Sequence, residues 1–337
     1  MNINITIKDN QGNVYINNIG HCKEEGNKNK NEWSVNKKQE KKEVDVIKEF
    51  YKPKKEDTFK LATIYNSLSG PYFEKKSKNV YYCGTELIFA RRADFSKKLV
   101  SINACKSRLC PMCSWRRSVK MYAEMRLMYD YVKEKYPDCK FLFITLTQAN
   151  VDNFRLKEEI NKIIKGFYNL LRKKEIKQIA IGAVRSVEIT YNKKEKTYHP
   201  HIHCLLHVAK GVYQGRNYIS QNKLGKLWKD TLKLDYEPVV DIRLFKAKNK
   251  EMEGRELAEL CKYSVKPNEY LVDDIEESRN VVQALDVAIA ARRLLSFSGS
   301  FKEARKVLKL NNDDITDKTP INIEEDDGFR ELYKWHF

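Results

Sequence analysis

The sequence lacks any stretch of about 18 apolar residues, the length that a membrane-spanning helix needs. The start of the chain, Met1–Thr6, also lacks the basic and apolar blocks of a secretory signal peptide. We therefore expect a cytoplasmic protein, a setting in which disulfides are disfavoured. The eight cysteines of the chain then need another explanation, and metal binding is the first one to examine.

Acidic residues are too few to balance the basic ones. The chain has 46 Asp and Glu against 64 Lys and Arg, a formal net charge of +18. Residues 311–337 hold eight acidic and three basic residues, so the preceding 310 residues hold 61 basic and 38 acidic ones. A body with this excess attracts polyanions, and nucleic acid is the first candidate. A lysine-rich protein without a nucleic-acid partner would carry the same charge, so charge alone does not decide.

The hydrophobic periodicity predicts an α+β fold in which helices pack on a central antiparallel β-sheet. Residues 1–20 alternate like a short hairpin, residues 21–57 indicate a flexible arm or a solvated helix, and order is expected to start near Phe59. Strands are expected at 141–147, 180–191 and 198–208, and helices at 119–132, 156–171, 221–232, 254–265 (ended by Pro267), 281–294 and 301–310.

Three histidines alternate along the strand expected at 198–208. Since alternate residues of a strand share a face, His199, His201 and His203 should point one way, while the apolar residues between them pack on the core. Neutral imidazole is the commonest metal ligand in proteins, so this face predicts a metal site. Glu188, on the preceding strand, is the best candidate for a third ligand, although a solvent-facing Glu188 is an equal alternative.

A carboxylate and a tyrosine, Glu259 and Tyr263, are four residues apart in the helix expected at 254–265 and should share its face. A tyrosine oxygen can attack a phosphodiester and form a covalent phosphotyrosine. A metal that polarises the phosphate lowers that barrier, and a carboxylate can later activate water to release the DNA. Tyr270 is the competing nucleophile, but it lies beyond Pro267 and off the face that carries Glu259.

Taken together, these segments resemble the plasmid rolling-circle replication initiators of the HUH endonuclease superfamily. The resemblance is carried, in the family's order, by three motifs and covers roughly residues 59–310. The N-terminal 58 residues and the acidic tail fall outside it. The motifs are Phe143-Ile144-Thr145-Leu146-Thr147, His199-Pro200-His201-Ile202-His203 and Lys262-Tyr263-Ser264-Val265-Lys266.

This resemblance implies an HUH-type nicking domain. His201 and His203 would bind Mg²⁺ or Mn²⁺, and Tyr263 would nick one strand at a plasmid origin and keep the 5′ end. The freed 3′-hydroxyl would prime synthesis by a host polymerase, with a host helicase as a further partner. Glu259, in place of a second tyrosine, would suit termination by hydrolysis.

Four cysteines have the spacing of a structural zinc site. Cys110 and Cys113 form a Cys-x₂-Cys pair, Cys105 precedes them, and Cys83 ends a strand-like run upstream. Four thiolates fill a tetrahedral site, although reduced, buried cysteines remain the alternative. The family resemblance supports zinc at this position. Basic residues beside the Cys cluster and in the tyrosine motif are candidates for contacts with DNA phosphates, namely Arg116, Arg117, Lys262 and Lys266. The resemblance also implies a basic helical region, which Arg292 and Arg293 would supply.

The predicted organisation has four parts. Residues 1–58 form the charged arm, 59–137 the Cys-rich zinc and DNA-contact region, 138–310 the catalytic domain and 311–337 the acidic tail. Two other functions remain open. One is an HUH transposase or relaxase, although relaxases usually place the tyrosine before the histidines. The other is a non-catalytic, zinc-dependent DNA-binding regulator, which would leave the histidine strand without a role.

Overall fold

A computed structural model describes residues 3–8, 14–19, 47–92, 97–210, 218–245, 250–310 and 326–334. The chain divides into two compact units, Met1–Pro53 and Lys54–Phe337. In the first unit, β1 (Ile3–Lys8) pairs antiparallel with β2 (Val14–Ile19), which confirms the predicted hairpin, and a π-helical turn covers Ile47–Tyr51. Residues 20–46 of the predicted arm lie outside the described residues.

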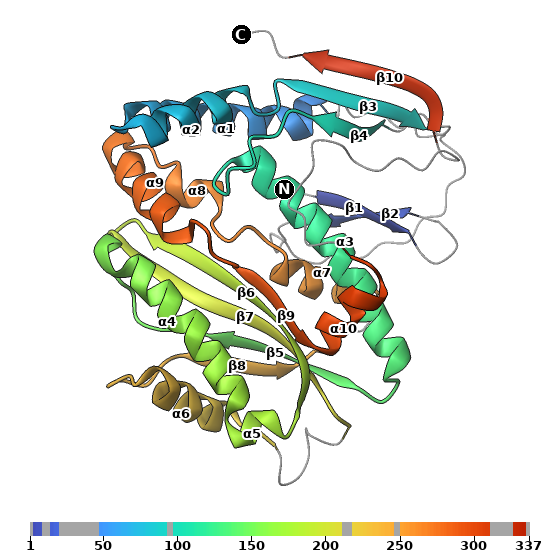
Figure 1. The fold of residues 1–337 in the computed structure, drawn as a ribbon, viewed down its shortest axis with the longest axis vertical. Helices are drawn as coiled ribbons and strands as arrows, with labels where there is room; N and C mark the ends of the chain where they lie inside the picture. The colour runs from blue at the N-terminus through green and yellow to red at the C-terminus, as the bar shows by residue number, and fades with distance from the viewer. Residues whose placement is uncertain are drawn as a thin grey trace, which may run out of the picture. The chain divides into compact units, whose positions relative to one another are not determined.

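A five-stranded antiparallel sheet forms the centre of the second unit (Figure 1). This sheet and the helices on it confirm the predicted α+β class. The hairpin of β6 and β7 supplies the longest pairing, and its turn is closed by the Asn192 carboxamide oxygen, which accepts from the amides of Lys194 and Glu195. The strands lie in the order β8 (Val240–Leu244), β5 (Lys140–Leu146), β7 (Thr197–Val208), β6 (Ala180–Asn192) and β9 (Leu295–Gly299).

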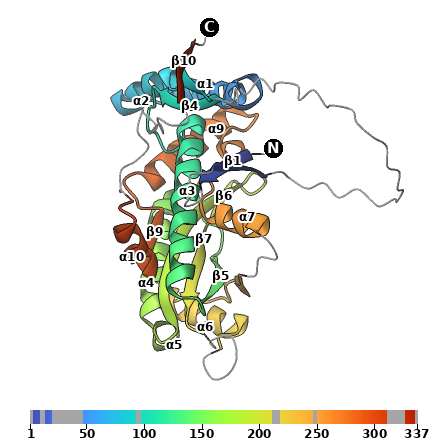
Figure 2. The same ribbon diagram turned by 90° about the vertical axis from the view of Figure 1, so that its right-hand side faces the viewer.

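Helices cover both faces of this sheet. On one face α4 packs against β7, α6 and α9, and the guanidinium of Arg185 on β6 lies 5.6 Å from the Tyr168 ring of α4. On the other face α3 runs along the sheet (Figure 2), and its Tyr129 ring lies 4.8 Å from Phe141 on β5. The helices are α3 (Pro111–Lys135), α4 (Asn153–Arg172), α5 (Lys174–Lys177), α6 (Gln221–Leu232), α7 (Lys250–Leu260), α8 (Pro267–Tyr270), α9 (Ile275–Ile289) and α10 (Ser300–Val307).

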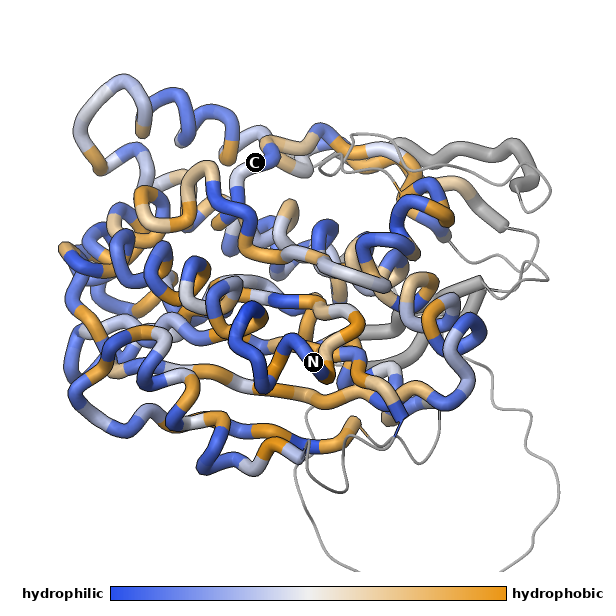
Figure 3. The backbone as a smooth tube through the Cα atoms, turned by 60° about the horizontal axis from the view of Figure 1, so that its bottom comes forward, coloured by the Kyte–Doolittle hydropathy of each residue, from blue (hydrophilic) through white to orange (hydrophobic). Residues whose placement is uncertain are grey.

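Hydrophobic stretches follow the strands, whereas the helices alternate between hydrophilic and hydrophobic residues along their length (Figure 3). This is the pattern of a core between a sheet and amphipathic helices. Helix α4 illustrates it, because Leu156, Ile160 and Ile163 are completely buried at helical spacing. Among the described helices, none is apolar over a length sufficient to cross a membrane.

A second, three-stranded sheet contains β3 (Glu86–Arg92) between β4 (Lys97–Ile102) and β10 (Asp326–Lys334), and two helices precede it, α1 (Lys52–Ser67) and α2 (Pro71–Tyr82). Part of the predicted acidic tail is thus a strand, β10. The sequence predicted that ordered structure starts near Phe59, but α1 begins earlier, at Lys52. The reason is that Lys55 is buried in α1 with its ammonium donating to the carbonyls of Tyr81 and Cys83, both at 2.7 Å.

The helix expected at 254–265 is shorter than predicted, and this changes the setting of the candidate nucleophile. Helix α7 ends at Leu260, so Tyr263 is not on a helix and does not share a helical face with Glu259. Pro267 begins the short helix α8 instead of ending α7. The physical cause is tertiary pairing, because the carbonyl of Ser264 accepts from the amide of Ile189 on β6 at 2.8 Å.

Candidate active site and two candidate metal clusters

The outer edge of β6 is covered by the segment that carries Tyr263. After Ser186, where the pairing of β6 with β9 ends, the amide of Val187 donates to the carbonyl of Leu294, and the amide of Ile189 donates to that of Ser264. Further along, the amide of Tyr191 donates to the Glu269 carboxylate at 2.9 Å. An edge strand with satisfied amides is protected from unwanted pairing. Here the same bonds hold the residue after Tyr263 directly beside Glu188.

Glu188, His201 and His203 come together on β6 and β7. Glu188 lies opposite His201 in the antiparallel register, and His203 follows two residues later on the same face. One ligand atom from each of the three residues lies within 4.8 Å of the others. The Oε2 atom of Glu188 is 3.2 Å from Nε2 of His203 and 3.7 Å from Nε2 of His201. Three donors converging on one point can hold a divalent cation.

Both histidines are oriented through the ring nitrogen that faces away from Glu188. Nδ1 of His201 lies 3.1 Å from the carbonyl oxygen of His199, to which it can donate. Nδ1 of His203 lies 3.2 Å from the hydroxyl of Thr145 on β5. In metal sites, such a second contact fixes the tautomer and leaves the other nitrogen free to bind the ion. Both Nε2 atoms are therefore suited to a metal.

The carboxyl group of Glu188 is ionised at neutral pH. Burial would raise its pKa, but the contacts with His201 and His203 and the charge of Lys266 hold that pKa well below its ordinary value. The ammonium of Lys266 lies 3.0 Å from Oε1 of Glu188. Lys266, predicted to contact DNA, therefore joins the Tyr263 segment to the histidine cluster.

His199 is not among the three converging residues. Its ring stacks on that of His201, with centroids 5.2 Å apart and planes inclined by 28°. Burial, followed by the charge of His201, lowers the pKa of His199, which favours the neutral ring. In this arrangement His199 supports His201 through its ring and its carbonyl oxygen.

Tyr263 is partly exposed and lines a groove in the surface of the second unit. Burial of its hydroxyl and the negative charge of Cys110 raise the pKa of Tyr263 above its ordinary value, so the hydroxyl stays protonated at neutral pH. The Glu259 carboxylate is ion-paired with Lys262. Tyr270, the competing nucleophile, is completely buried and donates to the carbonyl of Leu109, which is a structural role.

The groove beside Tyr263 has a volume of about 840 Å³. It lies between α3, α10, the residues leading into β9 and the segment after α7, and it includes Ser186, the register partner of His203. Glu124 is its one acidic lining residue among those the structure describes. Its nine basic lining residues are Arg108, Arg117, Lys120, Lys262, Arg292, Arg293, Lys302, Arg305 and Lys306.

Of the six basic residues predicted to contact DNA, this groove gathers Arg117, Lys262, Arg292 and Arg293. Arg117 also donates to the carbonyls of Lys106 and Ser107, in the loop between two of the cluster cysteines. Arg292 donates to Asn161 of α4 at 2.8 Å. Arg116 lies on α3 but does not line the groove.

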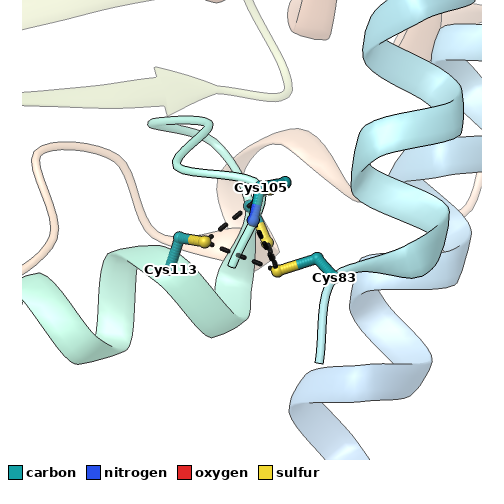
Figure 4. Close-up of side chains that lie close together, drawn as sticks. Cys83, Cys105 and Cys113 are labelled. Atoms are coloured by element: carbon teal, nitrogen blue, oxygen red, sulfur yellow. Dashed lines mark hydrogen bonds between the residues drawn. The ribbon is translucent and has the colours of Figure 1, made fainter. Parts of the chain in front are cut away.

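The four predicted cysteines form a second cluster. Figure 4 shows three of them, Cys83, Cys105 and Cys113. The sulfur of Cys83 lies 3.5 Å from that of Cys113 and 3.6 Å from that of Cys110, and the sulfurs of Cys105 and Cys113 are 3.7 Å apart. Four sulfurs placed tetrahedrally at the usual zinc–sulfur distance of about 2.3 Å would be separated by about 3.8 Å. The observed separations therefore fit a zinc ion and are much longer than a disulfide bond.

The surroundings of the cysteine cluster favour a negatively charged centre. Cys110 and Cys113 lie at the N-terminus of α3, where backbone amides stabilise anions. The ammonium of Lys55 is close by. Burial lowers the pKa of Lys55 to about 8, and the charges of Cys83, Cys110 and Cys105 oppose that change. Gly84 has a φ of +68°, and a Cβ there would lie 3.2 Å from Met112, so glycine suits the turn after Cys83.

The sequence did not predict the contacts that two candidate site residues make in the structure. Thr145 belongs to the first motif, but nothing in the sequence indicated that its hydroxyl orients His203. Lys266 was interpreted as a DNA contact, yet it pairs with Glu188. The available signal for Thr145 was its place in a predicted strand, but alternation gives the face of a residue and not its cross-strand partner.

Comparison with known proteins gives consistent similarities. A model of the replication protein family matches residues 96–337, which includes the acidic tail that the motif resemblance left out. The chain is 38% identical over 284 residues to a "Protein rep" of Streptococcus pneumoniae serotype 2, covering 83% of this chain and 87% of that one. It is 39% identical over 272 residues to a "Protein rep" of a Bacillus species, covering 76% and 88%. No solved structure matches.

Proposed function

Because the chain belongs to the replication protein family of plasmid rolling-circle Rep proteins, we propose that this replication initiator is an origin-specific endonuclease that nicks single-stranded DNA. In this proposal the second unit is an HUH-type nicking domain. Tyr263 is the nucleophile, and Glu188, His201 and His203 hold a divalent cation. The substrate is the plasmid origin, as a single strand or an extruded hairpin.

One observation carries the proposal: the Tyr263 segment is attached to the metal-binding strand at two adjacent positions. The carbonyl of Ser264 accepts from the amide of Ile189, and the ammonium of Lys266 pairs with Glu188. One contact is made to Glu188 and the other to the residue after it, so a phosphate bound at the cluster would lie beside this segment.

The donor set suits Mg²⁺ or Mn²⁺. Imidazole ligands favour Mn²⁺ chemically, whereas Mg²⁺ is the more abundant cation in cells. When bound, such an ion polarises a phosphate oxygen and stabilises the charge that develops on it. Thr145 and the carbonyl of His199 keep the two imidazoles oriented for this, and Lys266 adds positive charge at the same place.

In the nicking step, Oη of Tyr263 attacks the phosphorus of the scissile phosphodiester. A bond forms between Oη and phosphorus, the bond between phosphorus and the 3′ oxygen breaks, and the 3′ oxygen takes up a proton. The phenolic proton leaves to solvent. Because the pKa of Tyr263 is raised, this proton must be lost in the course of the attack rather than before it. The freed 3′-hydroxyl would prime a host polymerase, with a host helicase opening the duplex.

A later step would cleave the phosphotyrosine bond, and Glu259 is our candidate to activate water for it. Its carboxylate is about one-third exposed and is held by Lys262, the residue before Tyr263. The observations support Glu259 less directly than Tyr263, because α7 ends at Leu260 and the two residues do not share a helix face.

For the four cysteines we propose a structural Zn²⁺ site. Cys83, Cys105, Cys110 and Cys113 supply four sulfur donors at tetrahedral separations, and a site with four protein ligands leaves no position for substrate. Its role would be to hold the loop before α3 against α2. The buried hydroxyl of Tyr270 connects the same loop to the segment after Tyr263.

The test is a comparison of Tyr263→Phe with Tyr82→Phe on labelled single-stranded origin DNA from the protein's own replicon. Tyr82 is 62% exposed and provides the matched control. We expect Tyr263→Phe to bind DNA but not to nick it, and Tyr82→Phe to behave as the wild type. Unchanged nicking by Tyr263→Phe would exclude this nucleophile, and no nicking by any variant or by the wild type would favour a regulator that only binds DNA.

A further inference from the structure

The groove beside Tyr263 is larger and more positively charged than the attack of one tyrosine requires. Nine basic residues and one acidic residue line it, a net charge of about +8 at neutral pH. The acidic residue, Glu124, lies near two of these cations, with its carboxylate 3.4 Å from Arg305 and 3.8 Å from Lys120. The lining therefore carries a large excess of positive charge, although Lys262 is also paired with Glu259 outside the lining.

Helix α10 shows this most clearly. Lys302 and Lys306 are exposed, one turn apart on the same side of the helix, and like charges at this spacing destabilise a helix. Among the residues that the structure describes, neither ammonium forms an ion pair. Such an arrangement gains favourable interactions when a polyanion binds between α10 and α3.

The chemistry of the lining fits a phosphodiester backbone. Lysine, arginine and serine side chains are the usual partners of DNA phosphates, and Ser114, Ser118 and Ser264 lie among the cations. Phe297 lines the same groove, with its ring centroid 4.8 Å from the guanidinium of Arg305, and offers an aromatic surface. A groove of about 840 Å³ accepts a short stretch of a single strand rather than a duplex.

The position of Tyr263 indicates which part of the strand lies there. In an in-line displacement the leaving oxygen departs on the side of phosphorus opposite to the attacking oxygen. The strand that ends in the new 3′-hydroxyl therefore leaves away from Tyr263, whereas the strand that keeps the phosphate stays bonded to it. Tyr263 lines the groove, and Ser186, across from His203, connects the groove to the histidine cluster.

We infer that this groove binds the single strand on the 3′ side of the nick, the strand that remains covalently attached to Tyr263. The inference rests on the proposed nicking function and adds to it a binding site for the retained product. Contacts with the phosphates would keep that strand ordered after the 3′-hydroxyl has left.

The first experiment measures binding without nicking. The double variant Lys302→Gln/Lys306→Gln is compared with the wild type and with Lys174→Gln/Lys177→Gln, which removes two exposed charges from the short helix α5, outside the groove. The probe is an oligo-dT single strand. Each lost phosphate contact lowers the slope of log affinity against log salt by about 0.7, so the groove variant should lose about 1.4 and the control none. Equal slopes for all three proteins would overturn the inference.

The second experiment assigns the strand. The wild-type adduct with origin DNA is digested by a 3′→5′ single-strand exonuclease, and the nucleotides left on Tyr263 are counted by mass spectrometry. We expect a protected stretch on the wild type and the control, and a shorter one on the groove variant. Equal lengths would show that the retained strand lies elsewhere. If the wild type forms no adduct, the nicking function and the strand assignment both fail, while the salt slopes still report whether the groove binds single-stranded DNA.

Discussion

The cysteine cluster and the Glu188–His201–His203 cluster differ in the number of their ligands and in their surroundings. The first brings four sulfurs together, three of them from buried residues, and its neighbours are a helix N-terminus and a buried lysine. The second brings three donors together beside Lys266, next to a groove that carries Tyr263. Four protein ligands complete a tetrahedral site, whereas three leave a position for substrate. The cysteine cluster is therefore suited to stabilising the fold, and the Glu188–His201–His203 cluster is suited to chemistry.

The largest expected effect is on the chemistry of the three-donor cluster. We predict that His203→Ala lowers the nicking rate by about 10³-fold or more, because metal binding and phosphate polarisation are lost together. The midpoint of thermal unfolding should change little, since His203 is only partly buried. Nicking assays and thermal melts on the same preparations test the prediction. A large loss of stability with retained nicking would reverse the roles of the two clusters.

The next effect is on stability, in the cysteine cluster. We predict that Cys113→Ser lowers the free energy of unfolding by about 4 kcal/mol, as expected when a structural metal is lost. Metal analysis should find about one zinc per chain in the wild type and none in the variant. The control is Cys139→Ser, because Cys139 is only partly buried and lies outside the cluster, whereas Cys204 is buried and its substitution would itself lower stability. Full stability and unchanged zinc content in Cys113→Ser would contradict a four-sulfur site.

A smaller effect is expected when the hydroxyl that orients His203 is removed. Thr145→Val keeps the shape of the side chain but removes the hydroxyl that contacts Nδ1 of His203. Losing such a partner typically weakens metal binding by about 10–100-fold. We therefore expect the Mn²⁺ concentration that half-saturates nicking to rise, with a nearly normal rate at saturation. Thr190→Val, on β6 opposite His199, is the matched control. An unchanged metal requirement in Thr145→Val would remove Thr145 from the site.

The smallest effect concerns His207, on the same strand as the site histidines but in the core. Burial lowers the pKa of His207 to about 4, against about 6.5 in the unfolded chain. The unfolded state thus takes up a proton first as the pH falls, so stability is complete above pH 6.5 and declines between pH 6.5 and 4. The contribution between pH 7 and 5 is on the order of 1–2 kcal/mol. Denaturant unfolding at pH 7 and pH 5 should show a smaller loss of unfolding free energy for His207→Gln than for the wild type. An equal loss would show that His207 is not the group responsible.

Periodicity was sufficient to predict the elements that carry the site. The strands predicted at 180–191 and 198–208 are observed at Ala180–Asn192 and Thr197–Val208, as their alternating apolar spacing indicates. Alternation also placed His201 and His203 on one face. The position of Glu188 was left between two alternatives, because its contact with the histidines depends on the strand register. The register places Glu188 and His201 opposite each other.

Tertiary contacts explain what local pattern could not predict. The segment after Leu260 has helical spacing, but its backbone pairs with the edge of β6 through Ser264 instead. Lys55 belongs to a charged stretch that indicated a flexible arm or a solvated helix, yet in α1 its ammonium is buried and donates to two carbonyls. The Cys-x₂-Cys spacing predicted part of the cysteine cluster, and Cys83, more than 20 residues upstream, was added because a zinc site needs a fourth ligand.

The central claim is that Tyr263 is the nucleophile served by the three-donor cluster. The most direct measurement is to incubate the full-length protein with single-stranded origin DNA, with Mn²⁺ or with excess chelator, and to map the covalent product by peptide mass spectrometry. The account predicts a metal-dependent 5′-phosphotyrosine on Tyr263, absent from His203→Ala. An adduct on another residue, such as Tyr270, or cleavage that leaves no adduct at any time, would contradict it.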